Sequence, residues 1–534
     1  MMKTTMKQYS FASQLKSLAV VFGIALTFAS CAKEDVAQNP TNTEGDNDKN
    51  LTTFVAGDEA KTRTSLDYNS SDFSWEAGDY IYVKDDDGLL RKSSNAPTSK
   101  VASFMYKVPG KFTASSSYKV YYLGKNSSGS SVSISTAQSQ TAPDNTEHFG
   151  TAGDYGTATA TGSVGGKTFS FQLEHQPAYL VFQPYTSNTI LQNCYLTKVE
   201  VTSDNDIAET YSINTTTGAL TGSAGSKKIV LTTKGGNNPN GFPLSNSSAS
   251  VSTNGAYMVI KPGTHILKVR YWVKDVATNV EGTITKTLPA TAYASNTYYD
   301  MTANLNVRDY DGDHYYMWDA QQQYWYGYEW TRHLSGNTGQ PTLNGNSSSN
   351  YAQSNSDVSR WYNEYYPGYG VSNPATHASC KDLPNANEMS WYCMYGDPRW
   401  DGDELWTTMG HLYKGGMWFK KKSVLLAEGN YNTEKSADNT TDLRTTYKDY
   451  NNTNSSISNS GLPSAADANK YFYLPALGYY NSGQLYNVGS NGVYWSSSAN
   501  PWDSNGAYDL VFDSGGVRVG SYNRYGGFRA EAFQ

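Results

Sequence analysis

The stretch Asp79-Tyr80-Ile81-Tyr82-Val83 is rich in aromatic and β-branched residues and follows a glycine, Gly78. This composition favours a half-buried strand that begins after a turn. Similar short runs recur between turn residues, at Tyr118-Lys119-Val120-Tyr121-Tyr122, Phe169-Ser170-Phe171-Gln172-Leu173 and Tyr257-Met258-Val259-Ile260. Many short strands at this spacing, without a sustained helical stripe, predict a mainly β fold over residues 51–306.

The chain is too long for one hydrophobic core. Its 534 residues favour about three domains. We expect two small β-sandwiches, residues 51–165 and 166–306, with their boundary in the Gly-rich stretch 161–167. After residue 307 the sequence becomes dense in Trp and Tyr, which indicates a separate C-terminal domain, residues 307–534.

Composition narrows the classes of function. Aromatic residues at 14% supply enough apolar area to argue against global disorder. The net charge of -7 and the lack of a long basic run argue against nucleic-acid binding. Four cysteines are too few for a disulfide scaffold. The sequence contains no P-loop, no dinucleotide-binding glycine motif and no His-Glu-x-x-His metal motif. We therefore expect no cofactor and no metal.

The N-terminus has the pattern of an export signal. Lysines precede an apolar run, residues 18–28, that suits a signal peptide, residues 1–30. The run ends in Phe28-Ala29-Ser30-Cys31, which resembles the lipobox of bacterial lipoproteins and implies lipidation of Cys31. A signal peptide followed by a chance Cys is the alternative. Residues 31–50 are polar and acidic, so we expect a flexible tether on a protein anchored by lipid to the outer membrane, at the cell surface.

Ordered short motifs in the β region resemble the fimbrillin family: Thr62-Arg63-Thr64, Phe73-Ser74-Trp75-Glu76-Ala77-Gly78-Asp79-Tyr80-Ile81, Gln138-Ser139-Gln140-Thr141-Ala142, Phe171-Gln172-Leu173-Glu174-His175-Gln176-Pro177-Ala178 and Ser212-Ile213-Asn214-Thr215-Thr216-Thr217-Gly218. The resemblance implies two transthyretin-like sandwiches, and assembly into pili with other pilins by strand addition. It implies proteolytic processing at Arg63, for which an ordinary surface arginine is the alternative. Trp75 is interpreted as a core residue and His175 as a hydrogen-bonded structural histidine.

The C-terminal region resembles C-type-lectin-like domains, especially the major paralogous domain and the variable proteins diversified by retroelements. The resemblance rests on Cys380-Lys381-Asp382-Leu383-Pro384, Tyr471-Phe472-Tyr473-Leu474-Pro475-Ala476, Gly492-Val493-Tyr494-Trp495-Ser496-Ser497-Ser498, Ala507-Tyr508-Asp509-Leu510-Val511-Phe512 and Arg524-Tyr525-Gly526-Gly527-Phe528-Arg529. It implies an α+β domain. Pro384 and Glu388 also favour a helix that starts near Asn385.

Residues 479–527 have the composition of an adaptable binding surface. Asn, Tyr, Ser, Asp and Gly make up most of this stretch, and such residues dominate paratopes. We interpret Tyr494, Trp495, Leu510, Phe512 and Phe528 as the core of the scaffold. The predicted ligand contacts are Asn481, Tyr486, Asn487, Asn491, Asn500, Trp502, Asp503, Asn505, Asp513, Ser514, Arg518, Ser521, Tyr522, Asn523 and Tyr525. The alternative is that these residues only fill surface loops.

Several alternatives stay open at this stage. Cys380 and Cys393 are a candidate disulfide or two buried thiols. Asp309, Asp311 and Asp313 fit a solvated linker better than a calcium loop. The sequence predicts a binding protein rather than an enzyme: a pilus adhesin, placed at the pilus tip, for a glycan or protein on a host or neighbouring cell. A surface glycan hydrolase, an accessory glycan-binding lipoprotein and a structural pilin are the alternatives.

Overall fold

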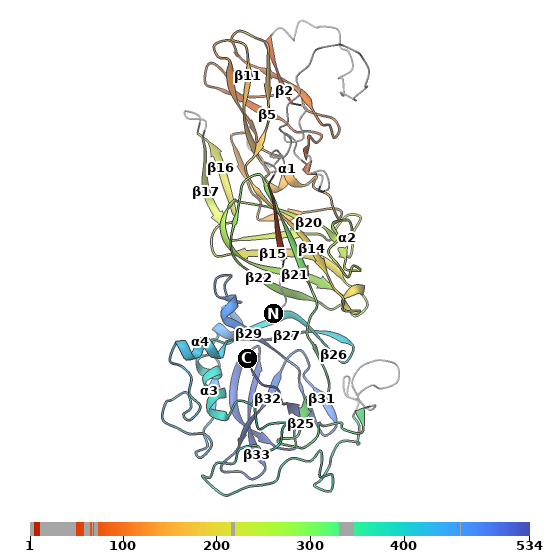
Figure 1. The fold of residues 1–534 in the computed structure, drawn as a ribbon, viewed down its shortest axis with the longest axis vertical. Coiled ribbons are helices and arrows are strands. Elements are labelled where there is room, and N and C mark those ends of the chain that lie inside the picture. The colour runs from red at the N-terminus through yellow and green to blue at the C-terminus, as the bar shows by residue number, and fades with distance from the viewer. Residues whose placement is uncertain are drawn as a thin grey trace, which may run out of the picture. The chain divides into compact units, whose positions relative to one another are not determined.

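The computed structural model of the chain describes residues 5–10, 50–57, 65–66, 68, 73–125, 127, 129–214, 219–329, 347–459 and 461–533. Cys31, Arg63 and the predicted tether up to residue 49 lie outside these ranges, as does the predicted signal peptide apart from Thr5–Ser10. Strands predominate among the described residues and the helices are short (Figure 1), which confirms the mainly β fold.

The chain divides into two compact units. The first comprises Met1–Val273 and Lys286–Leu305, and the second comprises Lys274–Thr285 and Asn306–Gln534. The region predicted as a separate C-terminal domain, residues 307–534, therefore lies in the second unit.

The first unit begins with an eight-stranded sheet in the order β6-β5-β8-β11-β12-β2-β7, in which β13 also pairs with β11. Its strands are β2 (Leu51–Ala56), β5 (Ile81–Lys84), β6 (Leu90–Lys92), β7 (Phe104–Pro109), β8 (Ser117–Tyr122), β11 (Gly156–Gly162), β12 (Thr168–Phe171) and β13 (Glu174–His175). Residues of β2 are alternately half-buried and buried. Trp75 is fully buried in this core between Tyr106 and Tyr122, as the sequence predicts. The short strands β3 (Ser65–Leu66) and β4 (Phe73–Ser74) pair with each other.

The Gly-rich stretch 161–167 is a hairpin turn rather than a boundary. β11 and β12 pair across it, Thr161 with Ser170 and Gly162 with Phe169. Gly165 has a φ of 74°, which glycine adopts without steric strain. β9 (Ser131–Ser133) and β10 (Ala137–Ser139), earlier in the chain, instead pair with β16 and β18. The strand pairing thus differs from the predicted division at residues 165 and 166.

The remaining strands of the first unit form further sheets. One has the order β1-β23-β14-β20, another includes β10-β18-β15-β21-β22 with β19 beside β15, and a third has the order β17-β16-β9. Their bounds are β1 (Thr5–Ser10), β14 (Ala178–Tyr185), β15 (Tyr195–Ser203), β16 (Ala208–Ile213), β17 (Leu220–Ser226), β18 (Lys228–Thr232), β19 (Phe242–Pro243), β20 (Ala256–Ile260), β21 (Gly263–Lys274), β22 (Glu281–Tyr293) and β23 (Thr297–Asn304). The short helices are α1 (Phe149–Ala152) and α2 (Val251–Asn254).

A buried polar network lies in the first unit. The Nδ1 atom of His175 is 3.0 Å from Asp154 Oδ1, and the Tyr179 hydroxyl donates to the same oxygen at 2.7 Å. All three residues are almost completely buried. Buried polar groups need such partners, and the prediction that His175 is a hydrogen-bonded structural residue is confirmed.

The second unit contains two main sheets. One pairs β26 (Arg399–Thr408), β27 (His411–Lys420) and β29 (Tyr471–Pro475), with β24 (Asp309–Tyr310) beside β26. The other has the order β25-β35-β32-β33-β34-β28. Its strands are β25 (Tyr315–Tyr316), β28 (Tyr450–Asn452), β32 (Gly492–Ala499), β33 (Gly506–Asp513), β34 (Gly516–Asn523) and β35 (Phe528–Arg529). β30 (Tyr479–Asn481) and β31 (Gln484–Tyr486) form a separate hairpin.

Helix α3 (Ala386–Tyr395) packs against β28 and β34. The Asn385 side chain accepts from the Glu388 backbone N–H at 3.0 Å, and the Glu388 carboxylate accepts from the Asn385 N–H at 2.9 Å. This capping box satisfies two N–H groups that the helix leaves unpaired, so the helix starts where the sequence predicts. α4 (Lys422–Ala427) and α5 (Ser456–Asn459) are shorter.

The residues predicted as the core of the C-terminal scaffold are buried, with exposed fractions of 1% or less. They are Tyr494, Trp495, Leu510, Phe512 and Phe528. The Trp495 and Phe528 rings stack at 4.2 Å between centroids, and Tyr494 stacks on Phe512 at 5.9 Å. These aromatic pairs hold β32, β33 and β35 together.

Candidate binding surface

A buried arginine joins the segments that form this surface. Arg524 is 0% exposed and its guanidinium lies 4.6 Å from the centre of the Trp318 ring. Its Nε donates to the carbonyl of Gly506 at 2.9 Å, and its Nη1 donates to the carbonyls of Asn363 and Tyr365 at 2.8 and 3.1 Å. One side chain therefore connects the start of β33 to a loop more than a hundred residues earlier. Burial lowers the pKa of Arg524 to about 10.

A buried aspartate fixes the same loop from the other side. Asp319 is fully buried, and its carboxylate accepts from Asn363 Nδ2 at 2.7 Å, the Thr376 N–H at 2.8 Å and the His377 N–H at 2.7 Å. A carboxylate that accepts several N–H bonds makes strong, charge-assisted contacts. Arg524 and Asp319 thus both bind Asn363 and fix the position of this loop.

We call residues 361–371 the aromatic loop. It contains Trp361, Tyr362, Tyr365, Tyr366, Tyr369 and Val371, of which Tyr365, Tyr369 and Val371 are 64%, 77% and 46% exposed. The loop lies along the β32–β33 connection, because the Tyr366 hydroxyl and the Gly370 N–H both donate to the carbonyl of Pro501, at 3.0 and 3.1 Å. Contiguous exposed aromatic groups of this kind are typical of interaction sites.

The β32–β33 connection, residues 500–505, presents a tryptophan to solvent. Asn500 is buried; it donates to Ser521 Oγ at 3.0 Å and accepts from the Trp502 N–H at 2.8 Å. Trp502 is 51% exposed, with its ring 6.2 Å from that of Tyr447. The Asn505 side-chain oxygen accepts from the Tyr362 hydroxyl at 3.2 Å. The connection and the aromatic loop are therefore parts of one surface.

The turn between β34 and β35 and the β30–β31 hairpin add further tyrosines. The hydroxyl of Tyr525, which is 41% exposed, accepts from Asn523 Nδ2 at 2.8 Å. Phe528 lies beneath, 5.1 Å from the Tyr522 ring and 5.7 Å from the Tyr479 ring. Tyr479 in turn stacks on the exposed Tyr486 at 5.7 Å.

The predicted contact residues separate into groups. Those at one end of β33 and β34 lie close together, namely Asn500, Trp502, Asp503, Asn505, Ser521, Tyr522, Asn523 and Tyr525. Asn481, Tyr486, Asn487 and Asn491 lie on the β30–β31 hairpin and the turn after it. Asp513 and Ser514 lie in the β33–β34 turn, at the other end of those strands. Arg518 lies in the middle of β34.

Among the predicted contact residues, Asn500 is the one that the structure buries. It is 6% exposed, and both ends of its amide are used inside the protein. Sequence analysis counts it with the other asparagines because composition does not distinguish an amide that shapes a loop from one that faces solvent. The remaining predicted contacts keep at least partial exposure.

Sequence analysis missed the aromatic loop. Residues 361–371 read Trp-Tyr-Asn-Glu-Tyr-Tyr-Pro-Gly-Tyr-Gly-Val, the same Tyr, Asn and Gly composition that pointed to residues 479–527. This composition is the signal in the sequence by which the aromatic loop could have been predicted. That the two segments meet depends on Arg524, which the sequence does not reveal.

A second buried charge lies beneath Arg518. Asp509 is fully buried, and neither carboxylate oxygen has a hydrogen-bond partner among the described residues. The closest cation is the Arg518 guanidinium, with Nη2 at 3.8 Å from Oδ1. Burial raises the pKa of Asp509 to about 7, and Arg518 only partly opposes this effect. At 3.8 Å and without a hydrogen bond, the attraction is too weak to offset desolvation.

The candidate disulfide between Cys380 and Cys393 is wrong. Both thiols are free and buried, and burial raises the pKa of each to about 12. Cys380 Sγ accepts from the Asp319 N–H at 3.3 Å, whereas Cys393 Sγ is 3.3 Å from the Val517 carbonyl. The two sulfurs thus have separate environments, and the alternative of two buried thiols holds.

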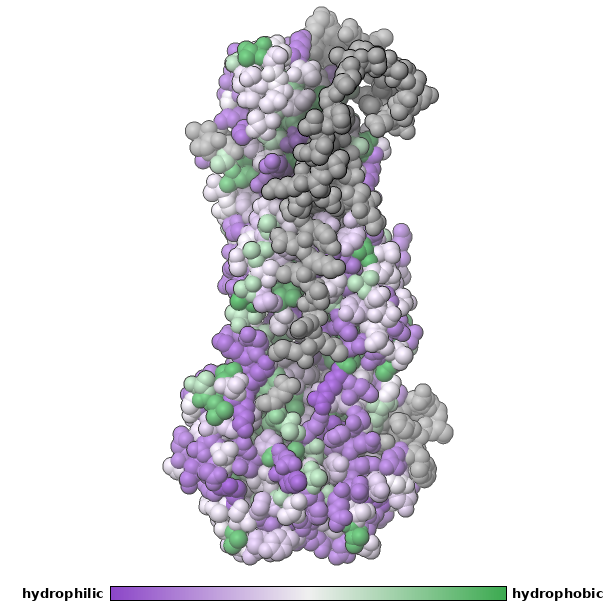
Figure 2. All heavy atoms as spheres, in the orientation of Figure 1, coloured by the Kyte–Doolittle hydropathy of each residue, from purple (hydrophilic) through white to green (hydrophobic). Residues whose placement is uncertain are grey.

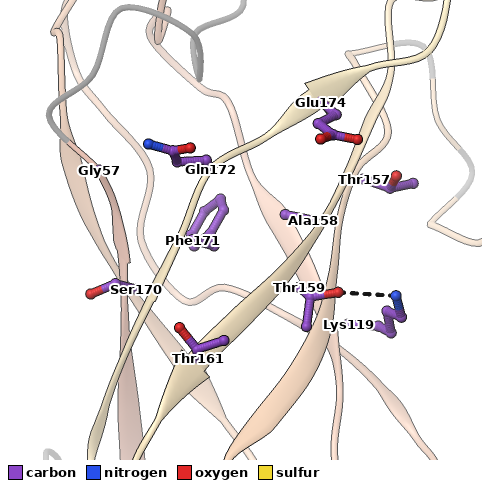
Figure 3. A pocket seen from close by; sticks show the side chains of 10 residues that line it. All are labelled: Gly57, Lys119, Thr157, Ala158, Thr159, Thr161, Ser170, Phe171, Gln172 and Glu174. Atoms are coloured by element: carbon purple, nitrogen blue, oxygen red, sulfur yellow. Dashed lines mark hydrogen bonds between the residues drawn. The ribbon is translucent and has the colours of Figure 1, made fainter. Parts of the chain in front are cut away.

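A polar cavity lies on the first unit (Figure 3). β11 pairs with β12 at Thr161–Gly162 and with β13 at Gly156–Thr157, and a cavity of about 590 Å³ lies beside these strands. Thr159 accepts a hydrogen bond from Lys119 Nζ there, at 3.0 Å. Most of the other lining side chains are also polar, including Thr157, Ser170 and Gln172. The cavity contains none of the predicted site residues.

The described residues contain neither a metal-binding cluster nor a membrane-spanning helix. Within these ranges, no three His, Cys, Asp or Glu side chains gather as a metal-binding group. Asp309 instead accepts from Thr407 Oγ1 at 2.9 Å, and Asp311 contacts His314 at 2.7 Å. Among the same residues, the helices lack the length and apolar character needed to span a membrane.

No protein-family model and no curated protein matches the chain. Among solved structures, a proposed cell adhesion protein from Bacteroides ovatus aligns at 13% identity and a TM-score of 0.30, over 48% of this chain and 92% of that one. A proposed cell adhesion protein from Bacteroides uniformis aligns at 17% identity and a TM-score of 0.30, over 49% of this chain and 94% of that one. The fimbrial anchor protein Mfa2 from Porphyromonas gingivalis aligns at 13% identity and a TM-score of 0.21, over 45% of this chain and 82% of that one. TM-scores this low support no conclusion about this chain.

Replacing Arg524 should loosen the surface. Arg524→Met removes the hydrogen bonds to the carbonyls of Gly506, Asn363 and Tyr365. The carbonyls of Gly506 and Tyr365 keep other donors, the Asn500 N–H and Asn373 Nδ2, so we expect a loss of roughly 1–3 kcal/mol in the stability of the second unit. Chymotrypsin should also cleave faster within residues 361–371, which mass spectrometry detects. Arg308→Met, at a side chain that is 63% exposed, is the control. Equal cleavage of both variants would contradict the role of Arg524.

Asp509 should make stability depend on pH. Its pKa of about 7 in the folded protein lies above the value of about 3.9 in an unfolded chain. The folded state therefore binds the extra proton, and stability falls as pH rises from about 4 to 7. We expect Asp509→Asn to remove this slope in thermal melts followed by tryptophan fluorescence. Asp513→Asn, at an exposed carboxylate, should keep it; an unchanged slope in Asp509→Asn would refute the assignment.

Proposed function

We propose that this protein is a cell-surface adhesin that binds a glycan or protein ligand through the second unit. The observation that carries this proposal is the exposed aromatic surface formed by the aromatic loop, residues 500–505 and residues 522–525. Tyr365, Tyr369 and Trp502 are each more than half exposed. Aromatic residues left in water on one continuous surface are characteristic of sites that bury them against a partner.

The rigid support of this surface favours binding. The buried residues Arg524 and Asp319 fix the aromatic loop through charge-assisted hydrogen bonds to Asn363. A loop that is ordered before binding loses less entropy in the complex. Tyrosine also provides a large contact area with few rotatable bonds. Figure 2 gives the surface hydropathy of one face, where polar residues surround scattered apolar groups.

The sequence supplies the finer parts of the proposal. We propose that Cys31 carries lipid, that residues 31–50 form the tether, and that the second unit is a C-type-lectin-like domain whose contact residues are diversified by a retroelement. A position at a pilus tip fits the chain order, because β23 leads directly into the second unit and is not a free strand for donation.

Removal of the exposed aromatics should abolish ligand binding. The chain from residue 32 onward is applied to glycan and cell-surface protein arrays, as the native sequence and as Trp502→Ala/Tyr525→Ala. We expect the native chain to bind a restricted set of spots and the double variant to bind them about ten-fold or more weakly. Tyr395→Ala, which removes a 41% exposed tyrosine of helix α3, is the matched control. Equal binding by the double variant would refute the proposal.

A second candidate function, strand exchange with other pilins, is favoured by the pairing of β1. β1 pairs antiparallel with β23, from Thr5 opposite Thr302 to Ser10 opposite Thr297. β1 lies within the predicted signal peptide. If that segment is removed, β23 becomes the edge of the β23-β14-β20 sheet, and an open edge can accept a strand from another chain.

Hydrogen exchange tests whether β23 is such an acceptor. We compare the whole chain carrying Cys31→Ala with a chain that starts at Ala32. In the shorter chain, those backbone amides of residues 297–302 that face β1 should exchange faster, because their hydrogen-bonded neighbour is gone, whereas the amides that face β14 keep their partners. Amides of β14, which keeps both neighbours, serve as the control. Equal exchange in β23 of both chains would rule out the exposed edge.

A further inference from the structure

Next to the aromatic loop lies a cavity of about 230 Å³ in the second unit. It is lined by Asp319, Gln321, Asn355, Val358, Trp361, Tyr362, Asn363, Glu364 and His377. None of these residues belongs to the predicted contact set. The cavity is smaller than the roughly 300–1,000 Å³ of sites for drug-sized ligands, which limits its occupant to a group about as large as a single small ring.

One wall of the cavity is aromatic. The Trp361 and Tyr362 rings lie 4.9 Å apart with an angle of 34° between their planes. The Trp361 indole N–H donates to Glu364 Oε1 at 2.8 Å, and Asn355 Nδ2 donates to Glu364 Oε2 at 3.3 Å. The indole is thus held in one orientation by the carboxylate next to it.

The polar groups of the cavity are also fixed in place. His377 Nδ1 is 2.6 Å from the carbonyl oxygen of Asp319. A carbonyl only accepts, so Nδ1 carries the proton and the Nε2 of a neutral imidazole is an acceptor. Glu364 retains lone pairs beyond its two internal contacts. Hydroxyl or amine donors of a ligand would find oriented acceptors here.

Charge excludes other occupants. The nearest arginine in sequence, Arg360, is engaged by Asp357 at 2.5 and 2.9 Å and by the Asn350 carbonyl at 2.7 Å. The guanidinium of Arg524 donates to the carbonyl of Asn363, but it is fully buried and does not line the cavity. An anionic ligand would therefore face Glu364 without a cation on the cavity wall, and like charges repel at short range. A purely apolar ligand would bury Glu364 and His377 without hydrogen bonds, which is unfavourable.

We propose that this cavity binds one neutral or amino-bearing sugar residue. A pyranose ring has C–H groups on its faces, which stack on Trp361 and Tyr362, and hydroxyls on its rim, which donate to Glu364 and His377. This inference rests on the proposed adhesin function and specifies its ligand as a glycan. Because the Tyr362 hydroxyl contacts Asn505, the sugars next in the chain would lie along residues 500–505, toward Trp502.

Saturation-transfer NMR tests the cavity separately from the larger surface. The chain from residue 32 onward is mixed with methyl glycosides of glucose, galactose, N-acetylglucosamine, glucosamine and glucuronic acid. At least one neutral or amino sugar should receive saturation, and the glucuronide should receive none. The signal should fall about ten-fold or more in Trp361→Ala and in Glu364→Gln, with melting temperatures measured to confirm folding. Glu428→Gln, at a carboxylate paired with Lys420, is the matched control.

The outcomes separate this inference from the proposed function. Trp502→Ala should keep the monosaccharide signal, because Trp502 does not line the cavity, while it weakens binding on the glycan array. Absence of saturation for every sugar, saturation of the glucuronide alone, or full signal in folded Trp361→Ala would overturn the sugar site. If array binding still depends on Trp502 and Tyr525 in that case, the adhesin function stands and only the cavity assignment fails.

Discussion

The guanidinium of Arg524 is the contact on which the surface of the second unit depends. It is fully buried against Trp318 and donates to carbonyls of Gly506, Asn363 and Tyr365. Burial of a charge is unfavourable unless hydrogen bonds compensate for lost hydration. The compensation here comes from backbone carbonyls of two distant segments, so one buried side chain joins the core strand β33 to the aromatic loop.

This arrangement explains how exposed aromatic side chains remain ordered. Tyr365 and Tyr369 extend into solvent, where apolar contacts with the core do not hold them. Their backbone is instead held by Arg524 from below and through Asp319 at Asn363 and Thr376. The loop therefore exposes its tyrosines to solvent while its backbone is held by buried side chains.

Much of the framework was predictable. The alternation in β2, the burial of Trp75, the capping box at Asn385 and the buried aromatics of β32, β33 and β35 all follow from local pattern. The errors concern long-range pairing. A Gly-rich stretch is a hairpin turn as easily as a linker, and only the pairing of β9 and β10 with β16 and β18 distinguishes the two. For Cys380 and Cys393 the sequence left a disulfide and two buried thiols open, and the separate buried surroundings of the two sulfurs decide for the thiols.

By itself, the sequence determined which residues form strands and which aromatic side chains enter the core, because both depend on periodicity and hydrophobicity along a short segment. It also indicated that residues 479–527 carry a binding surface. Only the tertiary structure decided that residues 361–371 join that surface, that Asn500 is buried within it, and that a cavity opens beside it. These facts depend on contacts between residues far apart in the chain, such as Arg524 with Asn363, and local sequence contains no information on which distant groups will meet.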